Sequence, residues 1–313
     1  MITRARLRSA LAEAGGTPAR GTVVHLAPQP VQQPFATARV VEGERLRAVR
    51  VGAAEPAPDG VGFADGIQRW SVEGHFGLVP VIRAEVAAGV LVRARGALTC
   101  AVRRVDEFLV VPAGRLAAAP REALGRVGLA VLEADAGPRP HPLVDRFAAA
   151  QVIERRREAL ERDACALFLA QASDPLIVDG GVRGLRGIPG AERAIGVVKH
   201  HETQFLDGPD LEVALTLPEG ARSSVFTREL EGGGGTLSWY LRLWPWTDED
   251  LLHGLTRIER LAQDGALPDA DRVSRWLMAE RAPIAGRDPR WDRLLYPLHE
   301  VETLLRAQAG GWH

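Results

Sequence analysis

The chain has 313 residues, of which 46% are hydrophobic and 25% charged, and its formal net charge is -1. This composition is typical of a globular protein with one large core or two modest ones, and the charge supplies no general attraction for nucleic acid. The apolar runs are shorter than the roughly 20 residues that cross a bilayer, and the basic N-terminus lacks the apolar core of a signal peptide. We therefore expect a cytoplasmic protein that does not bind membranes.

Cysteine and lysine are both rare in this chain. The two cysteines, Cys100 and Cys165, are far apart in the sequence. Without a Cys-x-x-Cys pair they support neither a zinc site nor a disulfide scaffold, so we expect both to be small core residues. Lys199 is the only lysine. Because an ammonium and a guanidinium do different chemistry, Lys199 is a candidate functional residue.

The first part of the chain predicts a helix and then a sheet. Residues 1–15 have a helical pattern, and the Pro-, Gly- and Ala-rich stretch to residue 60 contains short strand-like runs. Next come runs in which apolar and polar residues alternate, which predict an antiparallel meander of three or four strands over residues 61–72, 78–92, 98–105 and 108–111. Residues 113–142 predict a connection with a helical turn. We divide the chain into an N-terminal helix and extended segment, 1–60, and a main domain, 61–313.

The clearest helix is predicted over residues 142–172, where apolar residues recur at helical spacing. A short buried strand follows at 176–178, and a second strand begins at Ala194. Residues 211–246 alternate again around a run of four glycines, which predicts a hairpin. Three more helices are predicted, over residues 247–263, over 269–281 and from Pro297 onwards.

The order strands, helix, strand, strand, hairpin and helices predicts an α/β fold. An antiparallel meander followed by a crossing helix and returning strands fits a ribonuclease H-like mixed sheet with flanking helices. In that fold, acidic residues from the first strand, a helix, a central strand and a late helix converge at one edge of the sheet.

Two aspartates follow apolar strand residues and are each followed by glycine: Asp65 in Phe63-Ala-Asp-Gly and Asp179 in Leu176-Ile-Val-Asp-Gly-Gly. Asp-Gly by itself also marks an ordinary turn after a strand. A strand that ends in a carboxylate holds it rigidly, and the glycine lets another group approach closely. The repetition therefore indicates half of a divalent-metal site.

A two-metal phosphodiesterase needs three or four converging carboxylates, and hard oxygen ligands select Mn²⁺ or Mg²⁺ over zinc. The helix 142–172 has to supply the third carboxylate. Glu161 adjoins its apolar face and is the preferred residue, whereas Glu158 is expected to face solvent. Glu85, in the second strand of the meander, replaces Glu161 if its side chain faces Asp65.

Several short motifs between about residues 60 and 305 resemble, in their order and spacing, the NurA nuclease family. These motifs are Phe63-Ala-Asp-Gly, Arg157-Glu-Ala-Leu-Glu, Leu176-Ile-Val-Asp-Gly-Gly-Val-Arg-Gly, Ile195-Gly-Val-Val-Lys, Ser238-Trp-Tyr-Leu-Arg-Leu and Leu295-Tyr-Pro-Leu-His-Glu-Val-Glu. The resemblance implies a ribonuclease H-like core and a manganese-dependent DNA nuclease with 5′-3′ exonuclease and single-strand endonuclease activity. It also implies a homodimer that works with a HerA-type hexameric ATPase in DNA end resection and repair or in antiphage defence.

The resemblance also assigns roles to individual residues. It makes Asp65, Glu161 and Asp179 metal ligands. The final ligand falls at Glu302, with His299 as the competing candidate. Lys199 matches a lysine after the Ile-Gly strand, where it would contact the scissile phosphate or orient water. The chain departs from the family in having Gly-Ile and Gly-Gly after the two aspartates, where Gly-Ser is frequent.

Other interpretations remain open. The competing function is a catalytically inactive ribonuclease H-like scaffold that binds nucleic acid or docks the ATPase. His200 and His201 are adjacent on a strand and point to opposite faces, so they cannot easily share an ion. Trp239, Trp244 and Trp246 are expected to pack in the core or at a dimer surface rather than to stack on bases. The glycine-rich loop after Asp179 lacks the ending of a P-loop, so no ATPase activity is expected.

Overall fold

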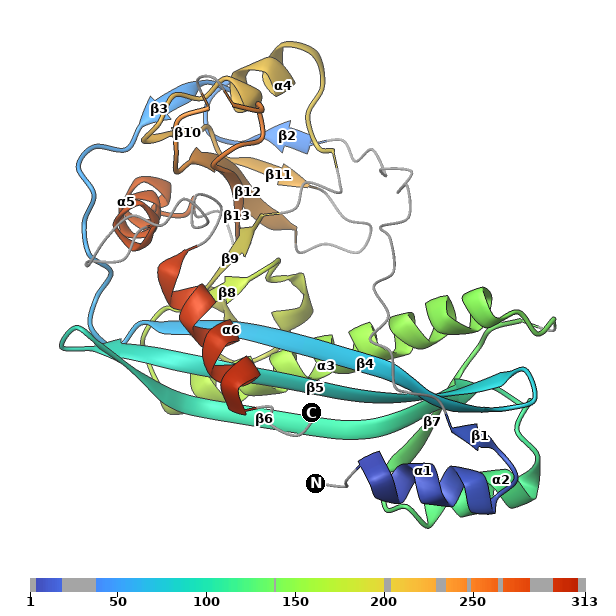
Figure 1. Cartoon of the computed structure of the whole chain (residues 1–313). Helices are drawn as coiled ribbons and strands as arrows, with labels where there is room; N and C mark the ends of the chain where they lie inside the picture. Colours follow the sequence, from blue (N-terminus) through green and yellow to red (C-terminus); the bar gives the residue numbers. More distant parts are fainter. Residues whose placement is uncertain are drawn as a thin grey trace.

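The computed structural model describes residues 4–18, 38–137, 139–199, 204–228, 235–246, 249–263, 267–281 and 295–308. The fold is mixed α/β, with a 13-stranded mixed sheet and flanking helices (Figure 1). None of the described helices is both long and apolar enough to cross a membrane.

Three long strands form the predicted antiparallel meander: β4 (Gly62–Phe76), β5 (Val79–Ala94) and β6 (Ala97–Pro112). Residues 98–105 and 108–111 belong to the single strand β6. The stretch after β6, predicted as a connection with a helical turn, contains α2 (Ala118–Gly125) and a further strand, β7 (Ala130–Ala134), which pairs in parallel with β6.

The helix α3 (Pro142–Gln171) confirms the clearest prediction from the sequence. It leads to β8 (Leu176–Asp179) and β9 (Ala194–Val198), with two short 3₁₀ turns at Arg183–Leu185 and Ala191–Arg193 between them. β8 pairs in parallel with β4, and β9 pairs in parallel with β8. A parallel partner requires a crossover connection, and α3 lies in the connection from the meander to β8. The strand order here is β9-β8-β4-β5-β6, so the first strand of the meander lies in the middle.

The sheet continues from β9 through β13 (Leu255–Leu261) to β12 (Thr236–Arg242), which pairs with both β11 (Phe226–Arg228) and β10 (Ala221–Ser223). The antiparallel pair β11 and β12 confirms the predicted hairpin, although its turn at residues 229–234 lies outside the described residues. The helix predicted over 247–263 is wrong, because Leu255–Leu261 is a strand hydrogen-bonded on both sides. The start of the region predicted to alternate from residue 211 is also wrong: it lies in α4 (Gly208–Leu215), which opens with a proline in its first turn.

The described part of the N-terminal segment joins the same sheet. Its helix α1 (Arg4–Glu13) was predicted, and three short strands follow it. They are β1 (Thr17–Pro18), β2 (Ala38–Val40) and β3 (Ala48–Arg50), which pair with β4, β11 and β10. The last helices, α5 (Ala270–Glu280) and α6 (Tyr296–Gln308), were also predicted.

The two faces of the sheet carry different helices. Phe63 belongs to a core cluster that includes Leu298, Val301 and Leu305 of α6. Its neighbour Ala64 belongs to a cluster that includes Cys165 of α3. Because successive side chains of a strand alternate between faces, α6 and α3 cover opposite faces of β4. It follows that Asp65 lies on the α6 face and Gly66 on the α3 face.

Two further expectations concern single side chains. Cys165 is buried as predicted, but Cys100 is exposed; the prediction was wrong for Cys100 because the first half of β6 is largely exposed. Trp239 and Trp244 are buried in the main core cluster, which confirms core packing.

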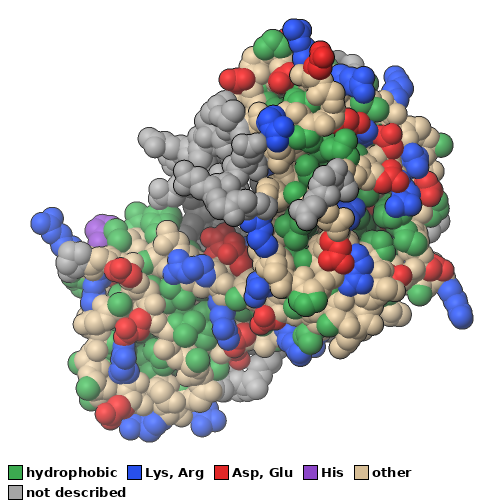
Figure 2. Space-filling view, turned by 180° about the vertical axis from the view of Figure 1, so that it is seen from behind, with side chains coloured by type: hydrophobic (Ala, Val, Ile, Leu, Met, Phe, Trp, Pro, Cys, Tyr) green, Lys and Arg blue, Asp and Glu red, His purple; other side chains and the backbone are tan. Residues whose placement is uncertain are grey.

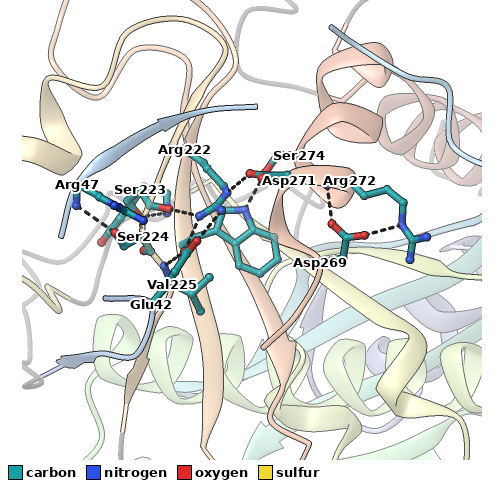
Figure 3. A network of polar contacts seen from close by, with 12 residues as sticks. Glu42, Arg47, Arg222, Ser223, Ser224, Val225, Asp269, Asp271, Arg272 and Ser274 are labelled. Atoms are coloured by element: carbon teal, nitrogen blue, oxygen red, sulfur yellow. Dashed lines mark hydrogen bonds and ion pairs between the residues drawn. The ribbon is translucent and has the colours of Figure 1, made fainter. Parts of the chain in front are cut away.

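A buried arginine ties the N-terminal segment to the sheet and to α5 (Figure 3). Arg222 of β10 is 3% exposed. Its Nη1 and Nη2 donate to the two oxygens of Glu42 at 2.7 and 2.8 Å, and its Nε donates to Asp271 Oδ1 at 2.6 Å. These bonds connect a β2–β3 loop residue, a strand and a helix that are distant in sequence.

Candidate active site

Asp65 and Asp179 are neighbours across two parallel strands. Ala64 of β4 is paired with Val178 of β8, so the two aspartates follow side by side where β8 ends. Phe63 and Ile177 belong to the same core cluster on the α6 face, and the alternation of side chains directs Asp65 and Asp179 to that face as well. The Gly66 N–H donates a hydrogen bond to Asp65 Oδ1 at 2.7 Å.

Lys199 follows the last residue of β9, the strand next to β8. Its Nζ donates to Asp179 Oδ2 at 2.6 Å, and the two side chains are 13% and 23% exposed. The only lysine of the chain therefore lies at the shared edge of β8 and β9, in an ion pair with one of the two strand-borne aspartates.

Glu161 comes from α3, on the other face of the sheet, and packs against the backbone of Gly66. A Cβ at position 66 would lie 2.6 Å from Glu161 Cγ, closer than real Cβ atoms approach other groups. The missing side chain of Gly66 thus allows the Glu161 carboxylate to reach β4. One helical turn earlier, Arg157 forms an ion pair with Glu161.

The pKa values show that the carboxylates interact with one another. The pKa of Asp65 is raised to about 8, chiefly by burial and then by the charges of Asp179 and Glu161, against the opposite effect of Lys199 and of the Gly66 N–H. Burial also raises the pKa of Glu161, with Arg157 lowering it and Asp179 raising it. Asp65 and Glu161 therefore each interact with the charge of Asp179, and two cationic side chains act against this effect.

Glu302 lies beside this cluster rather than inside it. Its Oε1 accepts from Arg306 Nη2 at 2.5 Å, and its Oε2 is 3.9 Å from His299 Nδ1. Glu302 lines a pocket together with Gly66 and Arg157. The structure thus brings Asp65, Asp179, Glu161 and Lys199 together and places Glu302 at the rim next to them.

Of the competing residues, His299 lies beside Glu302 on α6, whereas Glu158 and Glu85 lie elsewhere. Glu158 is exposed on α3. Glu85 is paired in register with Arg69, four residues along β4 from Asp65, and accepts from its Nη2 at 2.9 Å. It therefore does not face Asp65, and the idea that it replaces Glu161 is corrected. The histidines His200 and His201 lie outside the described residues.

The donor chemistry of the cluster fits a hard divalent cation. Within the part of the chain that the structure describes, no group of three or more His, Cys, Asp and Glu side chains has the spacing of a ready-made metal site. Nevertheless, Asp65, Asp179 and Glu161 offer only carboxylate oxygens, the ligands that Mg²⁺ and Mn²⁺ prefer. The raised pKa of Asp65 marks an uncompensated negative charge that such a cation would neutralise. In the structure, Lys199 forms an ion pair with Asp179, and Arg157 forms one with Glu161.

Sequence reasoning did not identify Arg157 and Arg306 as ion-pair partners of predicted metal ligands. Both are four residues from a predicted ligand, Arg157 before Glu161 and Arg306 after Glu302. This spacing places oppositely charged side chains on one helix face, so it was a signal that could have identified both ion pairs.

Scans against protein-family models and against curated proteins find no match. Among solved structures, the chain is similar to the crystal structure of the NurA nuclease from Sulfolobus solfataricus. The sequence identity is 11%, the similarity covers 86% of this chain and 81% of that chain, and the TM-score is 0.47. A likeness this weak carries no argument about function.

Proposed function

We propose that this chain is a divalent-metal-dependent DNA nuclease, a phosphodiester hydrolase. The observation that carries the proposal is the placement of Asp65 beside Asp179 at the end of β8, with Glu161 packed against the neighbouring Gly66. Neighbouring carboxylates repel one another, and a cation bound between them relieves this repulsion. Metal-dependent phosphodiesterases use such clusters.

In this proposal Asp65, Asp179 and Glu161 hold Mn²⁺ or Mg²⁺, and Glu302 at the rim is a further ligand. A bound divalent cation supplies an activated water and stabilises the leaving oxygen. Lys199 donates a hydrogen bond to Asp179. If Asp179 held a cation, the Lys199 ammonium would be free to donate to a non-bridging oxygen of the scissile phosphate.

The proposed fold class is ribonuclease H-like. Its support is the strand order β9-β8-β4-β5-β6, in which the meander β4 to β6 continues into two strands parallel to β4. Asp179 lies at the carboxyl end of β8, next to Asp65 within β4. We propose that β13, β12 and β11 extend this core on the β9 side.

The resemblance of the sequence motifs extends the proposal to the partners. It adds 5′-3′ exonuclease and single-strand endonuclease activity, a homodimer, and a HerA-type hexameric ATPase in DNA end processing or phage defence. The charge of the chain supports a partner that brings DNA to the active site. The formal net charge is -1, and acidic and basic side chains are interspersed over the face drawn in Figure 2. Such a surface attracts DNA weakly by itself.

The test is cleavage of end-labelled single- and double-stranded DNA by the full-length protein in Mn²⁺, Mg²⁺ or EDTA, with and without a HerA-type ATPase. We expect cleavage with a divalent cation and none in EDTA, and the position of the label reports the polarity. DNA that stays intact in every metal, with and without the ATPase, would sink the proposal.

The second candidate function is the inactive scaffold. One observation favours it: Lys199 and Arg157 form ion pairs with two of the three carboxylates. The scaffold reading is supported if the protein binds nucleic acid or the ATPase but leaves DNA intact with every divalent cation.

A further inference from the structure

A pocket of about 590 Å³ opens directly beside the carboxylate cluster. It is lined by the β4 segment Gly66–Arg69, by Arg157 of α3, and by Glu302 and Arg306 of α6. Its volume is within the usual range of ligand sites. Gly66 belongs both to this pocket and to the packing contact with Glu161, so the pocket is continuous with the cluster.

The floor of the pocket is a free strand edge. β8 ends at Asp179, so among the described strands β4 has no neighbour on this side from Gly66 until β1 pairs with Gly74 and His75. The Gly62 N–H donates to Pro175 O on the β8 side. Because backbone groups of a strand alternate between its two neighbours, Gly66 and Gln68 direct theirs to the same side. The Gly66 N–H is taken by Asp65 Oδ1, so the pocket offers the Gln68 N–H and the carbonyl groups of Gly66 and Gln68 along an extended line.

Three arginines from three elements surround this edge. Each has a carboxylate partner: Arg69 with Glu85, Arg157 with Glu161, and Arg306 with Glu302. A guanidinium has more N–H donors than one carboxylate can accept. The Arg306 side chain is 70% exposed, so donors that Glu302 does not take are available to a ligand. The lining residues include three arginines and one glutamate, while the partners Glu85 and Glu161 lie outside the lining.

We propose that this pocket binds a phosphodiester of single-stranded nucleic acid, next to the one that is hydrolysed, with Arg157 and Arg306 donating to its non-bridging oxygens. This inference rests on the proposed function. Arginine suits the role because its planar fork matches phosphate oxygens. An extended single strand can follow the β4 edge between α3 and α6 into the cluster, and Gly66 lies at the passage from one to the other.

An extended acidic peptide that adds a strand to β4 would use similar groups. The continuity of the pocket with the carboxylate cluster favours nucleic acid, because a strand bound at Arg306 and Arg157 is led towards Asp65 and Asp179. Binding of the acidic peptide instead is one outcome of the experiment.

The experiment is fluorescence anisotropy of a labelled DNA single strand of about 12 nucleotides. It uses the full-length protein in EDTA, where no cleavage is expected, over a series of salt concentrations. Wild type is compared with Arg306→Gln, Arg306→Lys and Arg157→Gln. The matched control is Arg272→Gln, which removes an exposed arginine of α5 that is paired with Asp269.

We expect Arg306→Gln to weaken binding by about 3- to 10-fold at low salt and to lower the slope of log affinity against log salt by about 0.7, the value of one lost phosphate contact. Arg157→Gln should act in the same direction. Arg306→Lys should keep the slope, and Arg272→Gln should bind as wild type. Thermal unfolding of each variant identifies any that fail to fold.

Affinity and slope that are unchanged in both Arg306→Gln and Arg157→Gln would overturn the proposal, and so would binding of a polyglutamate peptide in preference to DNA. The result also separates the two proposals, because binding is measured without metal. If Arg306→Gln binds DNA more weakly but wild type never cleaves it, the proposed binding pocket is supported and the proposed nuclease activity is wrong. If wild type cleaves DNA but the variants bind as wild type does, the nuclease activity is supported and the binding pocket is wrong.

Discussion

Glu161 occupies the space that a side chain on Gly66 would need: a Cβ there would lie 2.6 Å from Glu161 Cγ. The same glycine donates its N–H to Asp65 Oδ1. Gly66 therefore positions two of the three clustered carboxylates, one through a hydrogen bond and one through the absence of a side chain.

Substitution of Gly66 tests this arrangement. Gly66→Ala should push the Glu161 side chain away from β4 and lower the free energy of unfolding by about 1–3 kcal/mol, as overpacking does. It should also reduce metal-dependent cleavage by about 100-fold through misplacement of Glu161. Urea unfolding and single-turnover cleavage measure the two effects. Gly125→Ala is the control, because a Cβ at that position meets nothing within 4 Å. If Gly66→Ala and Gly125→Ala have the same stability and the same cleavage rate, the glycine at position 66 is not required to position Glu161.

The raised pKa of Asp65 predicts how stability depends on pH without metal. The pKa rises from 3.8 to about 8 on folding, so between these values the folded protein holds a proton that the unfolded chain has lost. The free energy of unfolding therefore falls as the pH rises through this window. Asp65→Asn removes this dependence and should be more stable than wild type at high pH by about 1–2 kcal/mol, less than the full linkage value because water screens a half-buried group.

Denaturant unfolding in EDTA, at pH 5 and pH 8.5, measures this difference. The control is Asp163→Asn, at an exposed position of the same helix as Glu161, which should follow wild type. If wild type loses no more stability than Asp65→Asn between the two pH values, folding does not raise the pKa of Asp65 and this prediction is wrong.

Lys199 provides a prediction about catalysis. Lys199→Gln should lower the rate of cleavage by about 100-fold, the usual cost of losing one donor to a developing negative charge. Lys199→Arg should restore little, because a guanidinium differs in shape from the ammonium that donates to Asp179. The measurement is the single-turnover rate in Mn²⁺. If Lys199→Gln cleaves at the wild-type rate, Lys199 has no role in catalysis and serves only to hold Asp179 in place.

The Arg222 network predicts a stability effect independent of the site (Figure 3). Arg222→Ala leaves Glu42 and Asp271 without their partner and should lower the free energy of unfolding by about 2–3 kcal/mol, less than for a fully buried pair. Because Arg222 lowers the pKa of Glu42 below 4.5, this loss should shrink as the pH falls below that value. Arg272→Ala breaks an exposed ion pair with Asp269 and should cost less than about 1 kcal/mol. Equal losses measured by urea unfolding would contradict this difference.

Much of the core could be predicted because its elements have clear periods. The alternation in the meander and the helical spacing of residues 142–172 gave elements that the structure confirms. β13 could not be predicted, because its central residues Arg257 and Glu259 are charged and yet buried. They form an ion pair at 3.0 Å, and a pattern of apolar and polar residues cannot reveal such a pair.

Part of the candidate site could also be predicted from the sequence, and part could not. Asp65 and Asp179 stood out because each follows an apolar strand and precedes a glycine, and parallel pairing of β4 and β8 makes them neighbours. Position 66 requires a glycine because α3 approaches β4 closely there. This tertiary contact could not be predicted from the local sequence. The pocket beside Glu302 depends on α6 returning to β4 from the end of the chain, and no local pattern contains that information.

The measurement that tests the central claim most directly is Mn²⁺-dependent cleavage of end-labelled DNA by wild type and by Asp179→Asn, with Asp163→Asn as the control. It is made under conditions in which wild type is active, with the HerA-type ATPase added if wild type requires it. Asp179→Asn keeps the size of the side chain and removes its charge. We expect it to abolish cleavage while binding of single-stranded DNA persists in EDTA, with Asp163→Asn cleaving as wild type. Cleavage by Asp179→Asn at the wild-type rate would contradict the assignment of the active site to this cluster.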